Sequence, residues 1–280
     1  MRDLLRDRLE SLLVNMNRQT KAEHWIETPR GRIFGQSWLP RDCESSAPIV
    51  LFHDSLGCIQ LWRDFPSLLA EATKRKVIAY DRLGFGKSDR RNEKSPLDFV
   101  TEEAELFFPL LRDRLGFEKF VAFGHSVGGA MAVLCAGRFP KECVAVITES
   151  AQTFVEDRTL EGISAAKKNF ENPEQFTKIE KYHGDKALWV LRAWTDVWLS
   201  AEFASWSLKD ELPKVKCPLL AIHGEKDEYG SQKFPEMLAG TTGGPAERLI
   251  LSGCGHIPHK EKQEVVLKAV ARFLKNQSRD

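Results

Sequence analysis

Short apolar runs alternate with stretches of helical spacing over most of the chain. We expect strands at 48–53, 76–81, 119–125, 143–149, 217–223 and 247–252. We expect helices near 60–74, 97–115, 127–138, 231–239 and 261–275. The strands are continuous runs rich in Val, Ile and Leu, which is typical of a parallel sheet covered on both faces. The pattern predicts an α/β fold with right-handed crossovers.

Two segments depart from this alternation. Residues 1–20 carry leucines at helical spacing and predict an amphipathic helix, followed by a hairpin of strands 23–28 and 31–38. Acidic residues dilute the polar face of this helix, so we expect it to pack on the domain or on a dimer mate rather than on a membrane. Residues 151–212 show no strand pattern and are rich in aromatic residues, which predicts a helical insertion.

A serine lies at the junction between a predicted strand and a predicted helix. The sequence Gly124-His125-Ser126-Val127-Gly128 follows the apolar run that ends the strand. Flanking glycines permit the strained backbone of so sharp a turn, which lifts the serine hydroxyl clear of the sheet toward solvent. The free amides of the helix N-terminus lie behind it. Ser126 is therefore the candidate nucleophile.

A candidate acid and a candidate base follow two later strands. Asp227 follows the strand at 217–223, and His256 follows the strand at 247–252. A serine nucleophile needs a histidine base, and the histidine needs an acid that holds its tautomer. Other positions for the acid are Glu225 or Glu228 in the same loop, or a residue after the strand at 143–149, which is the sixth strand when the two hairpin strands are counted. The last arrangement would place it at Glu149 or Asp157.

The order Ser, Asp, His, each after a separate strand, resembles the α/β-hydrolase superfamily. Two upstream motifs strengthen the resemblance: His53-Asp54-Ser55-Leu56-Gly57 and Asp81-Arg82-Leu83-Gly84-Phe85-Gly86-Lys87-Ser88. The resemblance implies a mostly parallel eight-stranded sheet with helices on both faces and a helical cap inserted after strand 6. The chain would then comprise an N-terminal helix (1–22), a core (23–150 and 213–280) and a cap (151–212).

The same resemblance implies an oxyanion hole formed by the backbone amides of Ser55 and Val127. It also implies that His53 holds the loop that follows the strand at 48–53, which we call the early loop. Asp54 stands where the family has glycine, and its carboxylate would oppose an oxyanion. We therefore expect it to point away from the hole and to accept hydrogen bonds from backbone amides. His125 is expected to pack or hydrogen-bond within the turn, and His259 to cap the following helix.

Composition limits the partners. The formal net charge is +1 with acids and bases interleaved, which offers no surface for nucleic acid or anionic membrane. No apolar run reaches 18 residues, and the N-terminus lacks the apolar core of a secretory signal. The six cysteines show no close pairing, so we expect free thiols, Cys254 among them, and a cytoplasmic location. We expect no metal, no cofactor, a small-molecule substrate, and a monomer or homodimer.

These observations favour a cofactor-independent serine hydrolase, a carboxylesterase or thioesterase for a small, largely apolar acyl group. Trp194 and Trp198 share a predicted helix face with Leu191. Either this face only packs the cap onto the core, or at least one of the two tryptophans also lines the acyl pocket. A C–C bond hydrolase, a lyase or a perhydrolase could use the same three residues. A ligand-binding receptor with little turnover is the alternative of another class.

Overall fold

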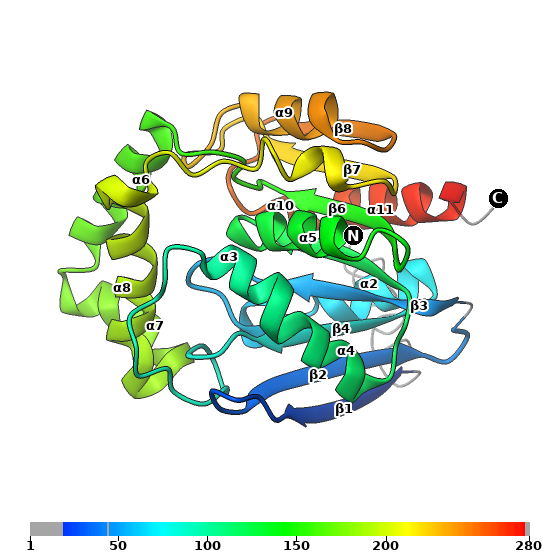
Figure 1. The fold of residues 1–280 in the computed structure, drawn as a ribbon, viewed down its shortest axis with the longest axis horizontal. Coiled ribbons are helices and arrows are strands. Elements are labelled where there is room, and N and C mark those ends of the chain that lie inside the picture. The colour runs from blue at the N-terminus through cyan, green and yellow to red at the C-terminus, as the bar shows by residue number, and fades with distance from the viewer. Residues whose placement is uncertain (1–18, 44, 278–280) are drawn as a thin grey trace, which may run out of the picture.

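An eight-stranded sheet forms the centre of the computed structural model, which describes residues 19–43 and 45–277 (Figure 1). Its order is β1-β2-β4-β3-β5-β6-β7-β8. The pairs β1–β2 and β2–β4 are antiparallel and the other five pairs are parallel, as the fold prediction requires. The strands are β1 (Gln19–Ile26), β2 (Ile33–Pro40), β3 (Ser45–Phe52), β4 (Arg75–Asp81), β5 (Phe120–His125), β6 (Cys143–Glu149), β7 (Leu219–Gly224) and β8 (Ala246–Leu251).

The first strand begins earlier than the sequence predicts. Residues 19–22 belong to β1, where Gln19 pairs with Pro40 of β2, so the predicted N-terminal helix was wrong at these four positions. The reason is that antiparallel pairing continues over the full length of β2. The rest of the predicted helix, residues 1–18, lies outside the described residues.

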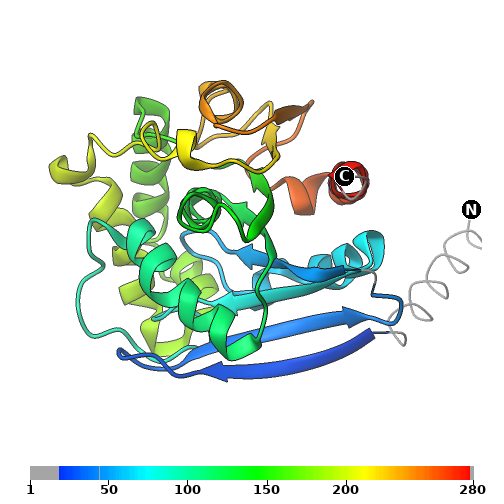
Figure 2. The same cartoon turned by 45° about the vertical axis from the view of Figure 1, so that its right-hand side comes forward.

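Helices cover both faces of the sheet (Figure 2). One layer contains α3, α4, α5 and α9, and the other contains α2 and α11. Figure 2 shows α2 (cyan) and α11 (red) on the opposite side of the sheet from α5 (green). The core helices are η1 (Ile59–Trp62), α2 (Phe65–Thr73), α3 (Phe99–Glu102), the π-helical turn η2 (Glu103–Phe107), α4 (Phe108–Leu115), α5 (Val127–Arg138), α9 (Lys233–Thr241), α10 (Pro258–Glu261) and α11 (Gln263–Gln277).

Each face of the sheet has its own hydrophobic core. In β3, Ile49 and Leu51 face the cluster under α2 and α11, whereas Val50 and Phe52 face the cluster under α5. Successive side chains of a strand point to opposite faces. A strand buried on both faces must therefore be apolar at every position, which explains the continuous runs in the sequence.

The interval between β6 and β7 is helical, as the sequence predicts. It contains α6 (Asp157–Asn169), α7 (Pro173–His183), η3 (Gly184–Lys186), α8 (Ala187–Trp198), η4 (Ala201–Phe203) and η5 (Leu212–Lys214). We call residues 151–212 the helical insertion. Figure 1 shows α6, α7 and α8 gathered at the left, beside the carboxyl ends of the parallel strands. The loops that carry Ser126, Asp227 and His256 follow β5, β7 and β8 and therefore lie at the same edge of the sheet.

Across the described residues, no helix has both the length and the apolar character needed to cross a bilayer.

Candidate active site

Ser126 occupies a strained turn between β5 and α5. Its backbone has φ 57° and ψ −128°, a region that residues with a side chain rarely adopt. Such a conformation costs on the order of 1–3 kcal/mol and persists only where the surroundings fix it. A Cβ on Gly124 would lie 2.0 Å from the carbonyl oxygen of Gly128. A Cβ on Gly128 would lie 2.1 Å from the carbonyl oxygen of Phe52, so both glycines are required by close backbone packing.

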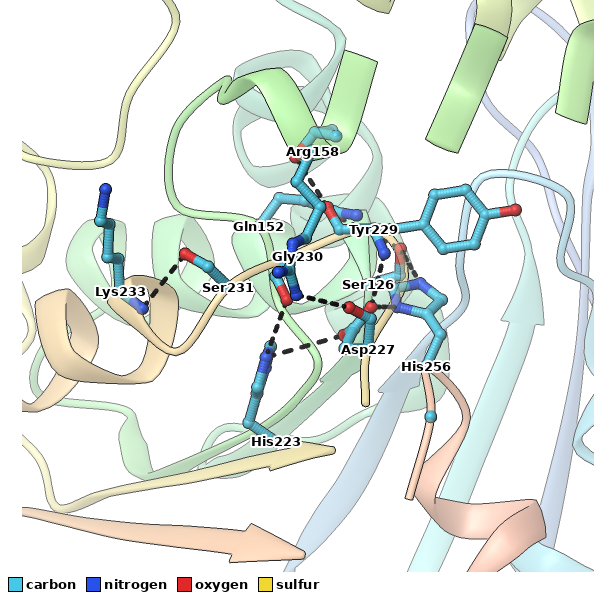
Figure 3. Close-up of polar contacts among 12 residues, drawn as sticks. Ser126, Gln152, Arg158, His223, Asp227, Tyr229, Gly230, Ser231, Lys233 and His256 are labelled. Carbon is cyan, nitrogen blue, oxygen red and sulfur yellow. Dashed lines mark hydrogen bonds and ion pairs between the residues drawn. The ribbon is translucent and has the colours of Figure 1, made fainter. Parts of the chain in front are cut away.

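Ser126, His256 and Asp227 form one hydrogen-bonded chain (Figure 3). His256 Nε2 lies 3.0 Å from Ser126 Oγ, and His256 Nδ1 lies 2.8 Å from Asp227 Oδ1. A carboxylate only accepts hydrogen bonds, so neutral His256 carries its proton on Nδ1 and leaves Nε2 free to accept the serine proton. The structure thus brings the three predicted residues together across 130 residues of sequence.

Asp227 is buried (1% exposed) and held as an acceptor. The amide of Tyr229 donates to Oδ1 at 2.8 Å, and His223 Nε2 lies 3.9 Å from Oδ2 on the other side. Burial acts to raise the pKa of Asp227, but the hydrogen bond and charge of His256 outweigh it. The pKa therefore lies below its ordinary value and the carboxyl is ionised at neutral pH.

The other carboxylates considered from the sequence have other partners or lie at the surface. Glu225 accepts from Ser252 Oγ and the Gly253 amide, both at 2.8 Å. Glu149 accepts from His259 Nδ1 at 2.7 Å. Glu228 and Asp157 are exposed. The expectation that His259 caps the following helix was wrong, because its ring is buried and turned toward Glu149.

Two acidic residues hold the loop that carries His256. Glu225 binds its start, as described above, and Glu261 accepts from the amides of Gly255 (2.7 Å) and Ile257 (3.1 Å). Because Gly255 and Ile257 flank His256, Glu261 holds the backbone on both sides of that residue. Sequence reasoning did not identify Glu261, which belongs to no motif.

Gln152 is a further residue that sequence reasoning missed. Its Oε1 lies 3.1 Å from Ser126 Oγ, and the side chain is buried. The expectation of a solvent-facing serine was wrong, since Ser126 is only 3% exposed and its hydroxyl faces Gln152 as well as His256.

The backbone amides of Ser55 and Val127 donate no hydrogen bond within the part of the chain that the structure describes. Val127 is the first residue of α5, where amides have no partner inside the helix. Asp54 Oδ1 accepts from the Leu56 amide at 2.9 Å, and its Oδ2 faces His125 Nδ1 at 3.5 Å. As expected, this carboxylate binds a backbone amide and makes no hydrogen bond to Ser126.

His125 connects Asp54 to the loop of His256. Its Nε2 donates to the His256 carbonyl at 2.8 Å, while Nδ1 faces Asp54. Burial acts to lower the pKa of His125, but Asp54 and the other acceptors raise it above its ordinary value overall. Burial likewise acts to raise the pKa of Asp54, and His125 outweighs it and holds the carboxyl in its ionised form.

Known proteins are similar to this chain in sequence or in fold. The alpha/beta hydrolase fold family model matches residues 47–178. The serine hydrolase BPHL of Homo sapiens is 28% identical over 192 residues, covering 66% of this chain and 64% of that protein. A crystal structure of a membrane phospholipase A has a TM-score of 0.78 at 19% identity, covering 99% of this chain and 93% of that one. The chain has the α/β-hydrolase fold.

A second relative is the dihydrolipoyllysine-residue acetyltransferase component of the acetoin cleaving system of Pseudomonas putida. It is 28% identical over 265 residues, covering 85% of this chain and 66% of that protein. The chain thus spans about two thirds of the length of each of these two curated relatives.

In this α/β-hydrolase fold, the helical insertion is bonded directly to the loops around Ser126. His183 of α7 accepts from the Gly86 amide through Nδ1 (2.9 Å) and donates to the Leu56 carbonyl through Nε2 (3.0 Å). Arg158 and Thr159 of α6 donate to the carbonyls of Asp227 (3.2 Å) and Tyr229 (2.7 Å). The insertion therefore helps to position both the early loop and the loop that carries Asp227.

His53 holds the early loop from the core side. Its Nδ1 donates to the Asp54 carbonyl at 2.8 Å, and its Nε2 accepts from the Arg82 amide at 3.1 Å. Burial lowers the pKa of His53 well below its ordinary value, which keeps the ring neutral and both bonds intact.

Both tryptophans singled out from the sequence line a small cavity beside Ser55. Trp194 and Trp198 are buried residues of α8, and Trp194 also contacts the ring of Tyr229 (centroids 5.9 Å apart). Tyr229 in turn packs on His256 (4.8 Å), so this cavity lies close to the hydrogen-bonded chain.

Within the described residues, no group of three or more His, Cys, Asp or Glu side chains is placed to hold a metal ion. Burial raises the pKa of the Cys254 thiol to about 12, so this cysteine near His256 is not a thiolate at neutral pH.

Proposed function

We propose that this α/β-hydrolase is a serine hydrolase, a carboxylesterase or thioesterase that acts on a small, largely apolar acyl group. The observation that carries the proposal is the continuous chain from Ser126 Oγ through His256 to Asp227, with distances of 3.0 and 2.8 Å. The strained backbone of Ser126 supports it further, because strain of this kind clusters at active sites.

In the proposed reaction, Ser126 Oγ attacks the acyl carbonyl while His256 Nε2 takes the hydroxyl proton. Asp227 stabilises the imidazolium that forms. The amides of Ser55 and Val127 donate to the oxyanion, since each has a free N–H. His256 returns the proton to the leaving oxygen or sulfur, and water then cleaves the acyl-enzyme by the same steps.

We infer that the helical insertion acts as a cap on this site. Ser126 is buried, and residues of α6, α7 and α8 contact the loops that surround it. Substrate entry would then require these helices to move, and the aromatic side chains of α8 would contact the acyl group.

A matched panel of aryl esters, aryl thioesters and vinylogous diketones tests the proposal against C–C bond cleavage. Hydrolysis of esters or thioesters, lost in Ser126→Ala, is the expected result. Faster cleavage of the diketones would assign the site to C–C hydrolysis instead. No turnover of any member, together with saturable binding, would favour a receptor.

A further inference from the structure

A small cavity lies between the loop after β4 and helix α8 of the insertion. Its free volume is about 10 Å³, room for about one water-sized group. Phe85, Trp194 and Trp198 provide aromatic walls, and the polar residues that line it are Ser55, Ser95 and Arg82. Because the Ser55 amide is the proposed oxyanion donor, the cavity adjoins the acyl side of the site.

Arg82 is the cation of this cavity, and it is buried (6% exposed). Its Nη2 donates to the Asp54 carbonyl at 2.9 Å, and the guanidinium lies 4.2 Å over the ring of Phe85. Its Nε has no hydrogen-bond partner, and no carboxylate oxygen of the described residues lies within 4.0 Å of its nitrogens. A buried guanidinium without an ionic partner is costly, because burial penalises an unpaired charge.

The nearest acids do not supply that partner. Asp54 faces His125, and Glu103 accepts from the Tyr80 hydroxyl at 2.8 Å. Burial raises the pKa of Glu103 to about 7, although Arg82 and Tyr80 oppose the rise. Glu103 is therefore only partly ionised at neutral pH and does not fully neutralise Arg82.

We propose that Arg82 binds a carboxylate on the acyl part of the substrate, so that the preferred substrate is a half-ester or half-thioester of a dicarboxylic acid. This inference rests on the proposed hydrolase activity and revises its substrate class: the acyl group is a short apolar chain that ends in a carboxylate, rather than a chain that is apolar throughout. The guanidinium presents donors that match a carboxylate, and the aromatic walls contact the intervening CH₂ groups.

The carboxylate belongs to the acyl group because the leaving group must face His256 to receive its proton. The cavity instead borders Ser55 on the oxyanion side. Trp194 and Trp198 both belong to α8, so displacement of this one helix would widen the cavity for a chain of a few atoms.

The test compares kcat/KM for an aryl monosuccinate and an aryl pentanoate, which have similar length and differ in the terminal charge. Wild-type protein should prefer the monosuccinate by about tenfold or more. Arg82→Gln should lower the ratio of the two values by on the order of 10- to 100-fold, and Arg82→Lys, which keeps the charge, by less.

Arg91→Gln is the matched control, since this arginine, whose side chain is 7% exposed, pairs with Glu102 and does not line the cavity. It should leave the ratio unchanged. Equal losses on both esters in Arg82→Gln would overturn the inference and leave Arg82 as a support for the Asp54 carbonyl. A wild-type preference for the pentanoate would overturn it without any variant.

Failure of the inference and failure of the proposed function give different results. Hydrolysis of both esters with a ratio that does not depend on Arg82 rejects only the carboxylate subsite. Hydrolysis of neither ester, with no fluorophosphonate labelling of Ser126, rejects the hydrolase and the subsite together.

Discussion

Replacement of Gln152 by leucine is predicted to lower kcat. The Ser126 hydroxyl has one proton, and both His256 Nε2 (3.0 Å) and Gln152 Oε1 (3.1 Å) lie within reach of it. Attack on a carbonyl requires that proton to go to His256. Rotation of the Gln152 amide by a half turn places its NH₂ against Oγ, so that both hydrogen bonds form at once.

We expect this rotated arrangement during turnover, with Gln152 as a donor that holds Oγ in line with His256. A neutral hydrogen bond of this kind contributes about 0.5–1.5 kcal/mol, which corresponds to roughly a 2- to 12-fold loss of kcat in Gln152→Leu. Leucine fits the buried site without leaving an unpaired polar group.

The assay is the pH dependence of kcat and KM on one aryl ester, with Gln152→Glu as the companion variant. An ionised glutamate can only accept, so this variant should lose more activity than Gln152→Leu at neutral pH and recover some of it as the pH falls. An unchanged kcat in Gln152→Leu would refute the reasoning. A higher kcat would refute it too and would show that Gln152 withholds the proton from His256.

Three further predictions concern the rest of the site. Asp227→Asn should lower kcat by about 10³- to 10⁴-fold because the amide favours the wrong imidazole tautomer, and a larger loss in Glu149→Gln would contradict this assignment. Trp194→Ala or Trp198→Ala should lower kcat/KM up to about 15-fold more for butyryl than for acetyl esters, since each buried CH₂ is worth about 0.8 kcal/mol, whereas equal losses would mean packing only. Burial lowers the pKa of His183 from 6.5, so the unfolded chain binds a proton that the folded protein does not, and stability should fall as the pH decreases below 6.5. His183→Gln, which can keep both backbone hydrogen bonds, should make the decline of Tm with pH shallower, and parallel curves for the two proteins would contradict the role of His183.

The sheet, its helices and the three residues of the hydrogen-bonded chain could be predicted from the sequence because these depend on local signals. A strand buried on both faces is recognisable from its own residues, and parallel strands that share an edge bring the residues after them together. Ser126, Asp227 and His256 each follow such a strand, so their proximity could be inferred without coordinates.

Contacts between side chains distant in sequence could not be predicted in this way. Gln152 lies 26 residues from Ser126 in no motif, and the pair of Glu149 with His259 spans 110 residues. The cavity that Arg82 shares with Trp194 and Trp198 depends on how α8 packs over the loop after β4, which periodicity alone does not specify. The start of β1 was missed because its pairing with β2, rather than its own composition, determines it.

Covalent labelling by a fluorophosphonate tests the central claim most directly, because the probe reacts with a serine only when a base activates it. Wild-type protein and Ser126→Ala would be incubated with the probe, and the modified peptide identified by mass spectrometry. We predict one adduct on Ser126 in the wild-type protein and none in the variant. Absence of labelling in folded wild-type protein, or an equal yield in Ser126→Ala, would contradict the account.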